Sequence, residues 1–310
     1  MKNLKVLAVV MAALTAFAFV GCSISTQNDG AVVFKDMTDR EIKLDAPAER
    51  IVALTAADCE IVYALGAGDK LVGRGKYCDY PEDVLAVAEV ESGSETNVEQ
   101  IIALNPQVVL MSTMDQTTEQ VEALEEAGIK VVVSAANDID GVYAAIEMIG
   151  KVVGMNDEAA KLVESMKTSF EQIKSKATGD GTKTVYFEVS PLQYGLWTAG
   201  SGTFMDEIAA MLGLKNAFAD ISGWAEISEE QVIERNPDYI VTISMYYGDG
   251  PTPVEEIVAR EGWQNITAIK ENRVFNSDSN AISRPGPRLV DAAEAMFKFV
   301  YEEIDLDKAA

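Results

Sequence analysis

Histidine is absent from this chain of 310 residues. Its absence excludes Ser-His-Asp and Cys-His nucleophiles, His-ligated zinc and an imidazole general base. Chemistry by carboxylates or lysine stays open, so an enzyme of that kind is an alternative. The segment Gly66-Ala67-Gly68 lacks the further glycine of a dinucleotide-binding loop, and Gly200-Ser201-Gly202 lacks the lysine of a phosphate-binding loop. We therefore expect no catalytic residues, no resident metal and no cofactor.

Positive charge is also scarce, because 25 lysines and arginines face 50 acidic residues and the net charge is -25. Nucleic-acid binding depends on clustered Lys and Arg, so this balance excludes a nucleic-acid partner. It also excludes electrostatic adhesion to an anionic bilayer. Any attachment to a membrane must therefore be hydrophobic.

The N-terminus has the pattern of an export signal. Lys2 and Lys5 precede an uncharged stretch, residues 6–21. This stretch is shorter than the run of about 20 apolar residues that a membrane-spanning helix needs. Residues 1–21 are therefore expected to be a signal peptide, and the mature protein is expected outside the cytoplasm.

Only three cysteines are present. The first ends the segment Phe19-Val20-Gly21-Cys22, which resembles a bacterial lipobox and implies that Cys22 is diacylated and anchors the chain to the cell membrane. The polar residues 22–31 would be the tether, whereas an ordinary cleaved signal with an incidental cysteine is the alternative. Export permits a disulfide between Cys59 and Cys78, but their sequence separation leaves free thiols equally open.

Short β-rich runs alternate with helical patterns in the first half of the chain. A hairpin is predicted at residues 32–44, and strands are predicted at residues 51–54, 108–111 and 130–133. Helices are predicted at residues 59–65, 98–104, 117–127 and 139–153. Such alternation favours an α/β fold with a mainly parallel sheet covered by helices.

A second series of the same kind follows. Strands are predicted near residues 184–188 and 239–243, and helices near residues 204–212, 229–235 and 287–301. The two series are also similar in sequence, because residues 99–106 (EQIIALNP) align with residues 230–237 (EQVIERNP) and residues 60–66 resemble residues 207–213. The repetition predicts two related Rossmann-like lobes.

One long helix is predicted between the two series, at residues 157–177, which contain neither glycine nor proline. Its apolar face is formed by Leu162, Met166, Phe170 and Ile173. At 1.5 Å per residue it would span about 30 Å, enough to join two lobes. The expected division is an N-terminal lobe, a linking helix and a C-terminal lobe, at residues 32–154, 155–179 and 180–310.

Several segments, among them Tyr77-Cys78-Asp79-Tyr80-Pro81 and Arg284-Pro285-Gly286-Pro287-Arg288, occur in an order and spacing that resemble a known family. This family comprises the solute-binding proteins of ABC importers for cobalamin and ferric siderophores. The resemblance covers about residues 50–304. It implies the periplasmic-binding-protein fold with a helical linker, a ligand held between the lobes, and an ABC permease dimer with its ATPase subunits as partners.

The resemblance also implies that one exposed glutamate on each lobe docks onto arginines of the permease. The matching residues are Glu99 and Glu230. A structural role is the alternative, because each glutamate follows a capping residue, Asn97 or Ser228, and a carboxylate stabilises the first turn of a helix. Equivalent positions on both lobes favour docking onto a permease dimer.

The family's ligand contacts correspond to Tyr77, Trp224 and Arg284. Tyr and Trp rings suit a planar or chelated ligand, and the Arg guanidinium suits its oxygen atoms. Trp224 is expected in a loop, and the alternative for it is packing in the core. The alternative for arginines such as Arg288 is binding to backbone carbonyls. Gly93 occupies the position at which the cobalamin binder of this family has a second tryptophan. The glycine leaves room for a different ligand, or for neighbouring Tyr80 to take the place of that tryptophan. We therefore expect a cobalamin-type corrinoid or a ferric siderophore, with haem on a tyrosine as a further alternative.

Overall fold

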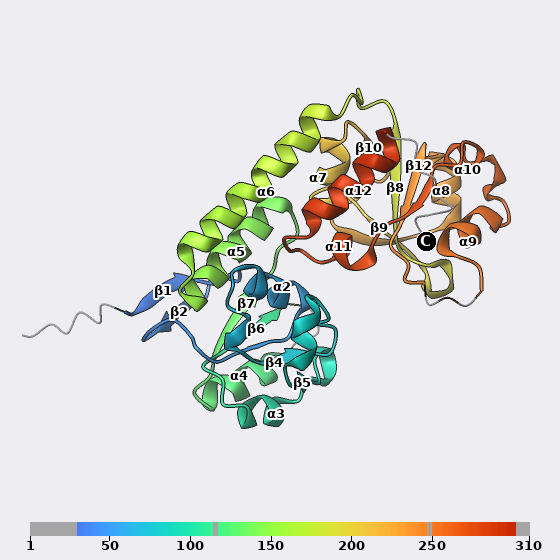
Figure 1. Ribbon diagram of the computed structural model, residues 1–310. Coiled ribbons are helices and arrows are strands. Elements are labelled where there is room, and N and C mark those ends of the chain that lie inside the picture. The colour runs from blue at the N-terminus through green and yellow to red at the C-terminus, as the bar shows by residue number, and fades with distance from the viewer. Residues whose placement is uncertain (1–29, 114–116, 247, 249, 302–310) are drawn as a thin grey trace, which may run out of the picture.

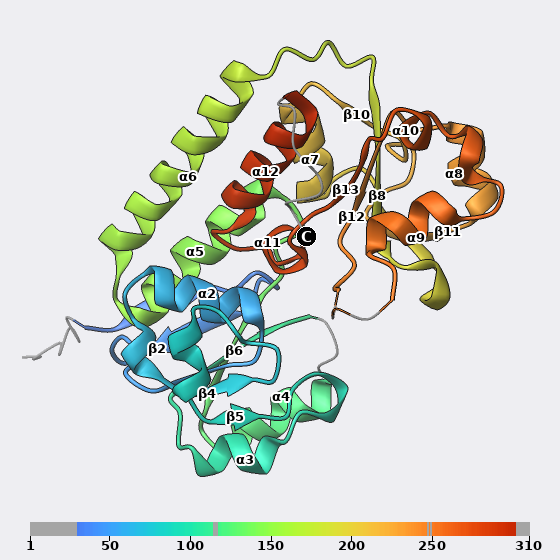
Figure 2. The same cartoon turned by 45° about the vertical axis from the view of Figure 1, so that its right-hand side comes forward.

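The computed structural model describes residues 30–113, 117–246, 248 and 250–301. The predicted signal peptide and Cys22 lie outside the described residues. Within these ranges, no helix is long and apolar enough to span a membrane. Figures 1 and 2 show two α/β lobes, connected along one side by the long helix α6 (Asn156–Lys176).

The first lobe is built on a parallel sheet with the strand order β5-β4-β3-β6-β7. Its strands are β3 (Ile51–Ala53), β4 (Leu71–Gly75), β5 (Glu89–Val90), β6 (Val108–Ser112) and β7 (Lys130–Ser134). An antiparallel hairpin precedes the sheet, formed by β1 (Val32–Lys35) and β2 (Glu41–Leu44). The helices of this lobe are α2 (Ala56–Ala64), α3 (Val98–Ala103), α4 (Thr118–Glu126) and α5 (Ile139–Val153). The central strands are buried on both faces, as helix-covered parallel strands are.

The second lobe has a mixed sheet with the order β11-β9-β8-β12-β13, and β10 pairs with β8. Its strands are β8 (Thr184–Ser190), β9 (Leu196–Ala199), β10 (Lys215–Asn216), β11 (Trp224–Ile227), β12 (Tyr239–Thr242) and β13 (Val274–Asn276). Its helices are α7 (Phe204–Met211), α8 (Glu229–Arg235), α9 (Pro253–Ala259), α10 (Thr267–Lys270), α11 (Ser279–Ser283) and α12 (Leu289–Tyr301). The loop expected around Trp224 is wrong, because this residue begins β11, which pairs antiparallel with β9.

The sequence repeat corresponds to repeated backbone geometry. Helices α3 and α8 are each followed by an asparagine in the left-handed region, Asn105 at φ 49° and Asn236 at φ 45°. Asparagine tolerates this conformation better than most residues, and the proline that follows prevents the helix from continuing. Helices α2 and α7 are likewise followed by Gly66 and Gly213, both with positive φ. The two lobes therefore use the same helix ends.

Helix α6 holds the lobes together by packing. Its buried residues are Ala159, Val163, Met166, Phe170 and Ile173, whereas Leu162, expected on this face, is only half-buried. It contacts α5 of the first lobe and both α7 and α12 of the second. The largest apolar cluster of the protein contains residues of both lobes around these helices. The lobes are therefore joined through a shared apolar core as well as through the chain.

The two described cysteines are free thiols, so no disulfide links them. Cys59 and Cys78 are both buried, and each Sγ lies 3.7 Å from the carbonyl oxygen of Ala53. Hydrogen bonding with Cys78 and burial raise the pKa of the Cys59 thiol well above its ordinary value. A thiol that stays protonated is a poor nucleophile, which is typical of a structural cysteine.

Candidate functional site

A cavity of about 220 Å³ lies where the carboxyl ends of β3, β6 and β7 face the second lobe. Its lining comes from residues that end or follow these strands and, from the other lobe, from Ser283, Arg284 and Pro285. Open α/β sheets bind ligands at this edge. A larger hollow of about 660 Å³ lies beside α6, but it is lined mainly by the sides of helices. The cavity between the lobes is therefore the candidate site.

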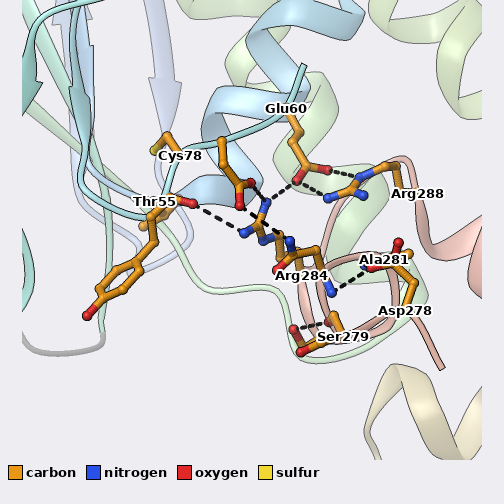
Figure 3. A network of polar contacts seen from close by, with 12 residues as sticks. Thr55, Glu60, Cys78, Asp278, Ser279, Ala281, Arg284 and Arg288 are labelled. Atoms are coloured by element: carbon orange, nitrogen blue, oxygen red, sulfur yellow. Dashed lines mark hydrogen bonds and ion pairs between the residues drawn. The ribbon is translucent and has the colours of Figure 1, made fainter. Parts of the chain in front are cut away.

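An ion-pair network closes one side of this cavity and joins the lobes. Arg284 and Arg288 of the second lobe converge on Glu60 of α2 in the first lobe (Figure 3). Arg284 Nη1 donates to Glu60 Oε1 at 2.8 Å, and Arg288 donates through Nε to Oε2 at 2.8 Å and through Nη2 to Oε1 at 2.7 Å. The side chain of Glu60 is only 2% exposed. Both of its oxygens are satisfied by the opposite lobe.

Arg284 makes further contacts with the loop that follows β4. Its Nη1 donates to Asp79 Oδ1 at 2.6 Å, and its Nη2 donates to the carbonyl oxygen of Tyr77 at 3.2 Å. Burial opposes ionisation of Asp79, but hydrogen bonding with Arg284 and the charge of that residue outweigh it and lower the Asp79 pKa. In this conformation, the guanidinium that was predicted to contact ligand is engaged mainly with the first lobe.

Three aromatic side chains predicted to contact ligand are at least partly exposed. Tyr77 is 70% exposed and Tyr80 48%, and the Tyr80 ring lies 4.2 Å from the Arg288 guanidinium carbon. Trp224 is 38% exposed and packs against Phe204, with ring centroids 5.5 Å apart. The structure therefore places Tyr77 beside Arg284 and Tyr80 beside Arg288, whereas Trp224 begins β11 of the second lobe.

Trp224 is connected to the cavity through its neighbour. The backbone N–H of Phe204, at the start of α7, donates to the carbonyl oxygen of Asn137 in the first lobe at 2.9 Å. Asn137 itself lines the cavity. Trp224 thus packs against a residue that contacts the first lobe beside the cavity.

Comparison with known proteins identifies the fold and the class of this site. The model of the periplasmic binding protein family matches residues 51–281. The chain belongs to the periplasmic binding protein family. An uncharacterised ABC transporter substrate-binding lipoprotein of Bacillus subtilis (strain 168) is 36% identical over 278 residues, which cover 88% of this chain and 86% of that protein.

Two further relatives of this periplasmic binding protein are informative. The vitamin B12-binding protein of Vibrio campbellii (strain ATCC BAA-1116) is 26% identical over 250 residues, covering 80% of this chain and 88% of that protein. The crystal structure of a possible iron-binding (periplasmic solute-binding) protein from Staphylococcus epidermidis ATCC 12228 is 30% identical with a TM-score of 0.71, covering 82% of this chain and 99% of that chain.

These relatives confirm a binding protein rather than an enzyme, so the alternative of carboxylate or lysine catalysis is not supported. The periplasmic binding protein is the extracytoplasmic solute-binding component of an ABC transporter. In the part of the chain that the structure describes, no group of three or more Cys, Asp or Glu side chains is placed to hold a metal ion.

The binding protein carries the two predicted docking glutamates on exposed helix starts. Glu99 lies in the first turn of α3 and Glu230 in the first turn of α8, on the sides of the lobes remote from α6 (Figures 1 and 2). Of these two helices, α8 has a full capping box, formed by Ser228 and Gln231, whereas Asn97 caps α3 without one. Hydrogen bonding with Ser228 lowers the pKa of Glu230. Both glutamates are thus exposed on helices that do not line the cavity between the lobes.

Two features of the site go beyond the sequence prediction. Gly93 has φ 87°, a left-handed conformation that strongly disfavours a bulky residue such as tryptophan there. Arg288 binds the carboxylate of Glu60 rather than backbone carbonyls, so that alternative is wrong. Two arginines four positions apart signal that an acidic partner is needed, but nothing in the sequence selects Glu60 from 50 acidic residues.

Proposed function

We propose that this protein captures a cobalamin-type corrinoid or a ferric-siderophore complex between its lobes and delivers it to an ABC permease. The observation that carries the proposal is the junction itself, where Tyr77 of the first lobe adjoins Arg284 of the second and Tyr80 adjoins Arg288. The names of the Vibrio and Staphylococcus relatives support this ligand class. The mature chain would be tethered to the extracytoplasmic face of the membrane by a diacylated Cys22.

The exposed rings would bind the broad faces of the ligand. Tyr77 and Tyr80 provide flat amphipathic surfaces on the first lobe, and Trp224 provides one on the second. Arg284 uses three of its five donor hydrogens within the protein, so it can offer the others to amide or phosphate oxygens of the ligand. Gly93 leaves the first lobe without the second tryptophan wall, which favours a ligand that differs in shape from a fully sandwiched corrin.

Ligand binding is tested by titration of tryptophan fluorescence. The purified mature protein is titrated with cyanocobalamin, ferrioxamine B, ferrichrome and haemin, with correction for absorbance by each ligand. We expect quenching by a corrinoid or a ferric siderophore, and loss of most of the quenching in Trp224→Phe. The control is Trp263→Phe, because Trp263 is fully buried in the second lobe. Absence of binding by both classes at high micromolar concentration, or binding of haemin alone, would contradict the proposed ligand.

Permease docking is tested by reversing the two charges. The double variant Glu99→Lys/Glu230→Lys is expected to bind ligand like the unchanged protein, yet to support no more uptake than cells without the protein, because cations would oppose arginines of the permease. Uptake of the radiolabelled ligand is measured in cells that carry the cognate permease. The control Glu122→Lys/Glu234→Lys changes one exposed glutamate on each lobe. Normal uptake by the first variant would refute docking through Glu99 and Glu230.

A further inference from the structure

The cavity between the lobes contains a carboxylate that the ion-pair network does not use. Asp58 lies in the first turn of α2, is 1% exposed and lines the cavity. Its Oδ2 accepts a hydrogen bond from Ser134 Oγ at 3.0 Å, and the same hydroxyl lies 3.3 Å from the carbonyl oxygen of Met111. Its Oδ1 is buried and has no hydrogen-bond partner in the described part of the chain. A buried acceptor without a donor is costly, so it requires an explanation.

The surroundings of Asp58 leave its charge uncompensated. Burial raises the pKa of Asp58 to about 6, and the neighbouring hydroxyls of Ser134, which donates to Oδ2, and Thr55, which accepts the backbone N–H of Asp58, oppose this effect. The ionisable groups around it are Cys59 and Glu60 on α2, Arg74 of β4 beside Cys59, and Arg284 at the cavity edge. Arg284 directs its hydrogen bonds to Glu60, Asp79 and the Tyr77 carbonyl instead. At neutral pH, the cavity therefore holds a mostly ionised carboxylate with one unused oxygen.

We propose that this cavity is a subsite for a hydrogen-bond donor at the end of a short side arm of the ligand, an ammonium or a primary amide that binds Asp58 Oδ1. The inference rests on the proposed function, since the arm belongs to a ligand held between the lobes. An anionic arm would be repelled by Asp58, and the net charge of -25 likewise disfavours anionic ligands. The ligand therefore presents an N–H donor here.

The size and lining of the cavity agree with a side arm rather than a whole ligand. A cavity of about 150 Å³ can hold benzene, so about 220 Å³ accommodates a chain of several heavy atoms but not a corrin ring or an intact chelate. The apolar part of the lining suits a methylene stem and consists of Ala56, Ala57, Ala135, Ala136, Ala145 and Pro285. Asp58 lies among these small residues, where a donor at the tip of the stem can reach it.

The test uses Asp58→Asn, which keeps the shape of the side chain but can present an amide donor where the ligand needs an acceptor. The mature protein, this variant and the control Asp69→Asn, at an exposed position of the same lobe, are titrated with three probes. Ferrioxamine B carries a terminal ammonium, ferrioxamine E is a cyclic analogue without one, and cyanocobalamin carries primary amides. We expect the bound probe to lose about 10- to 100-fold in affinity with Asp58→Asn and nothing with Asp69→Asn.

The probes distinguish the two donors. Loss confined to ferrioxamine B identifies an ammonium arm, and loss for cyanocobalamin identifies an amide arm. For an ammonium arm, affinity in the unchanged protein falls as pH is lowered through about 6, because Asp58 then becomes protonated, and Asp58→Asn abolishes this dependence. Equal affinity of the two proteins for a bound probe would overturn the subsite while leaving the proposed function intact.

A fragment experiment keeps the subsite testable if no large probe binds. Propylammonium, propionamide and propionate are added at high millimolar concentration to ¹⁵N-labelled protein, and the backbone amide signals of α2 are followed. We expect shifts with propylammonium or propionamide that are absent with propionate and absent in Asp58→Asn. If no large probe binds and neither donor fragment shifts these signals, the subsite is refuted.

Discussion

Glu60→Ala is expected to lower the free energy of unfolding by about 3 kcal/mol. The substitution removes the carboxylate that Arg288 binds and leaves Arg284 with Asp79 as its remaining acidic partner. The side chain of Arg288 is 14% exposed and that of Arg284 is 11% exposed. Removing one member of a buried ion pair costs about 3–5 kcal/mol, because the charge that remains is desolvated and unpaired. We expect the lower end of that range because Asp79 still binds Arg284.

Urea denaturation followed by circular dichroism measures this loss. Glu60→Gln is the matched comparison, since it keeps the shape and one acceptor oxygen and should lose less. Glu82→Ala removes an exposed glutamate from the same lobe and should change little. Surface ion pairs are screened by salt, whereas buried pairs are screened much less. A loss below about 1 kcal/mol, or one that disappears in high salt, would show that the network behaves as a surface ion pair.

Asp58→Asn is expected to stabilise the ligand-free protein at pH 8 by about 2–3 kcal/mol more than at pH 4. Burial raises the pKa of Asp58 from 3.8 to about 6, so between these values the folded protein binds a proton that the unfolded chain has released. Stability from this group is therefore lost as pH rises through that interval and stays lost above it. One pKa unit corresponds to about 1.4 kcal/mol, which gives a cost of about 3 kcal/mol at pH 8.

The measurement compares urea denaturation of Asp58→Asn and the unchanged protein at pH 4, 6 and 8. Titration of the other carboxylates cancels in the difference, and any loss specific to the asparagine amide adds the same amount at each pH. Asp69→Asn, at an exposed position of the same lobe, is the control. A difference that does not change with pH would mean that Asp58 ionises normally in the folded protein. Stabilisation by Asp58→Asn together with weaker ligand binding would indicate that Asp58 is retained for binding.

The sequence predicted the bounds of a helix well where its capping residues lie next to it in the chain. The predicted bounds of α5, residues 139–153, are those observed, because Asp138 caps its first turn and Gly154 ends it in the left-handed conformation. The prediction for α2 was less accurate: this helix begins at Ala56 rather than Cys59, because Thr55 accepts the backbone N–H of Asp58. The strand β11 was missed because its partner β9 lies in another part of the chain.

The class of protein followed from the chain alone. The absence of histidine narrowed the possible enzymes and the repeat predicted two lobes, whereas the resemblance of segments such as those around Tyr77 and Arg284 to a known family predicted a binding protein, which the family match confirms. The same holds for α6, whose position follows from an uninterrupted helical pattern.

The pairing of Glu60 with Arg284 and Arg288, and the unused oxygen of Asp58, depend instead on how the two lobes meet. Glu60 and Arg288 are 228 positions apart in the chain, and no local propensity relates them. Whether a charged group is paired or left without a partner depends on which side chains packing brings within hydrogen-bond distance and how far water is excluded. Which side chains meet, and how far water is excluded from them, are decided only when the two sheets, α6 and the junction between the lobes have formed.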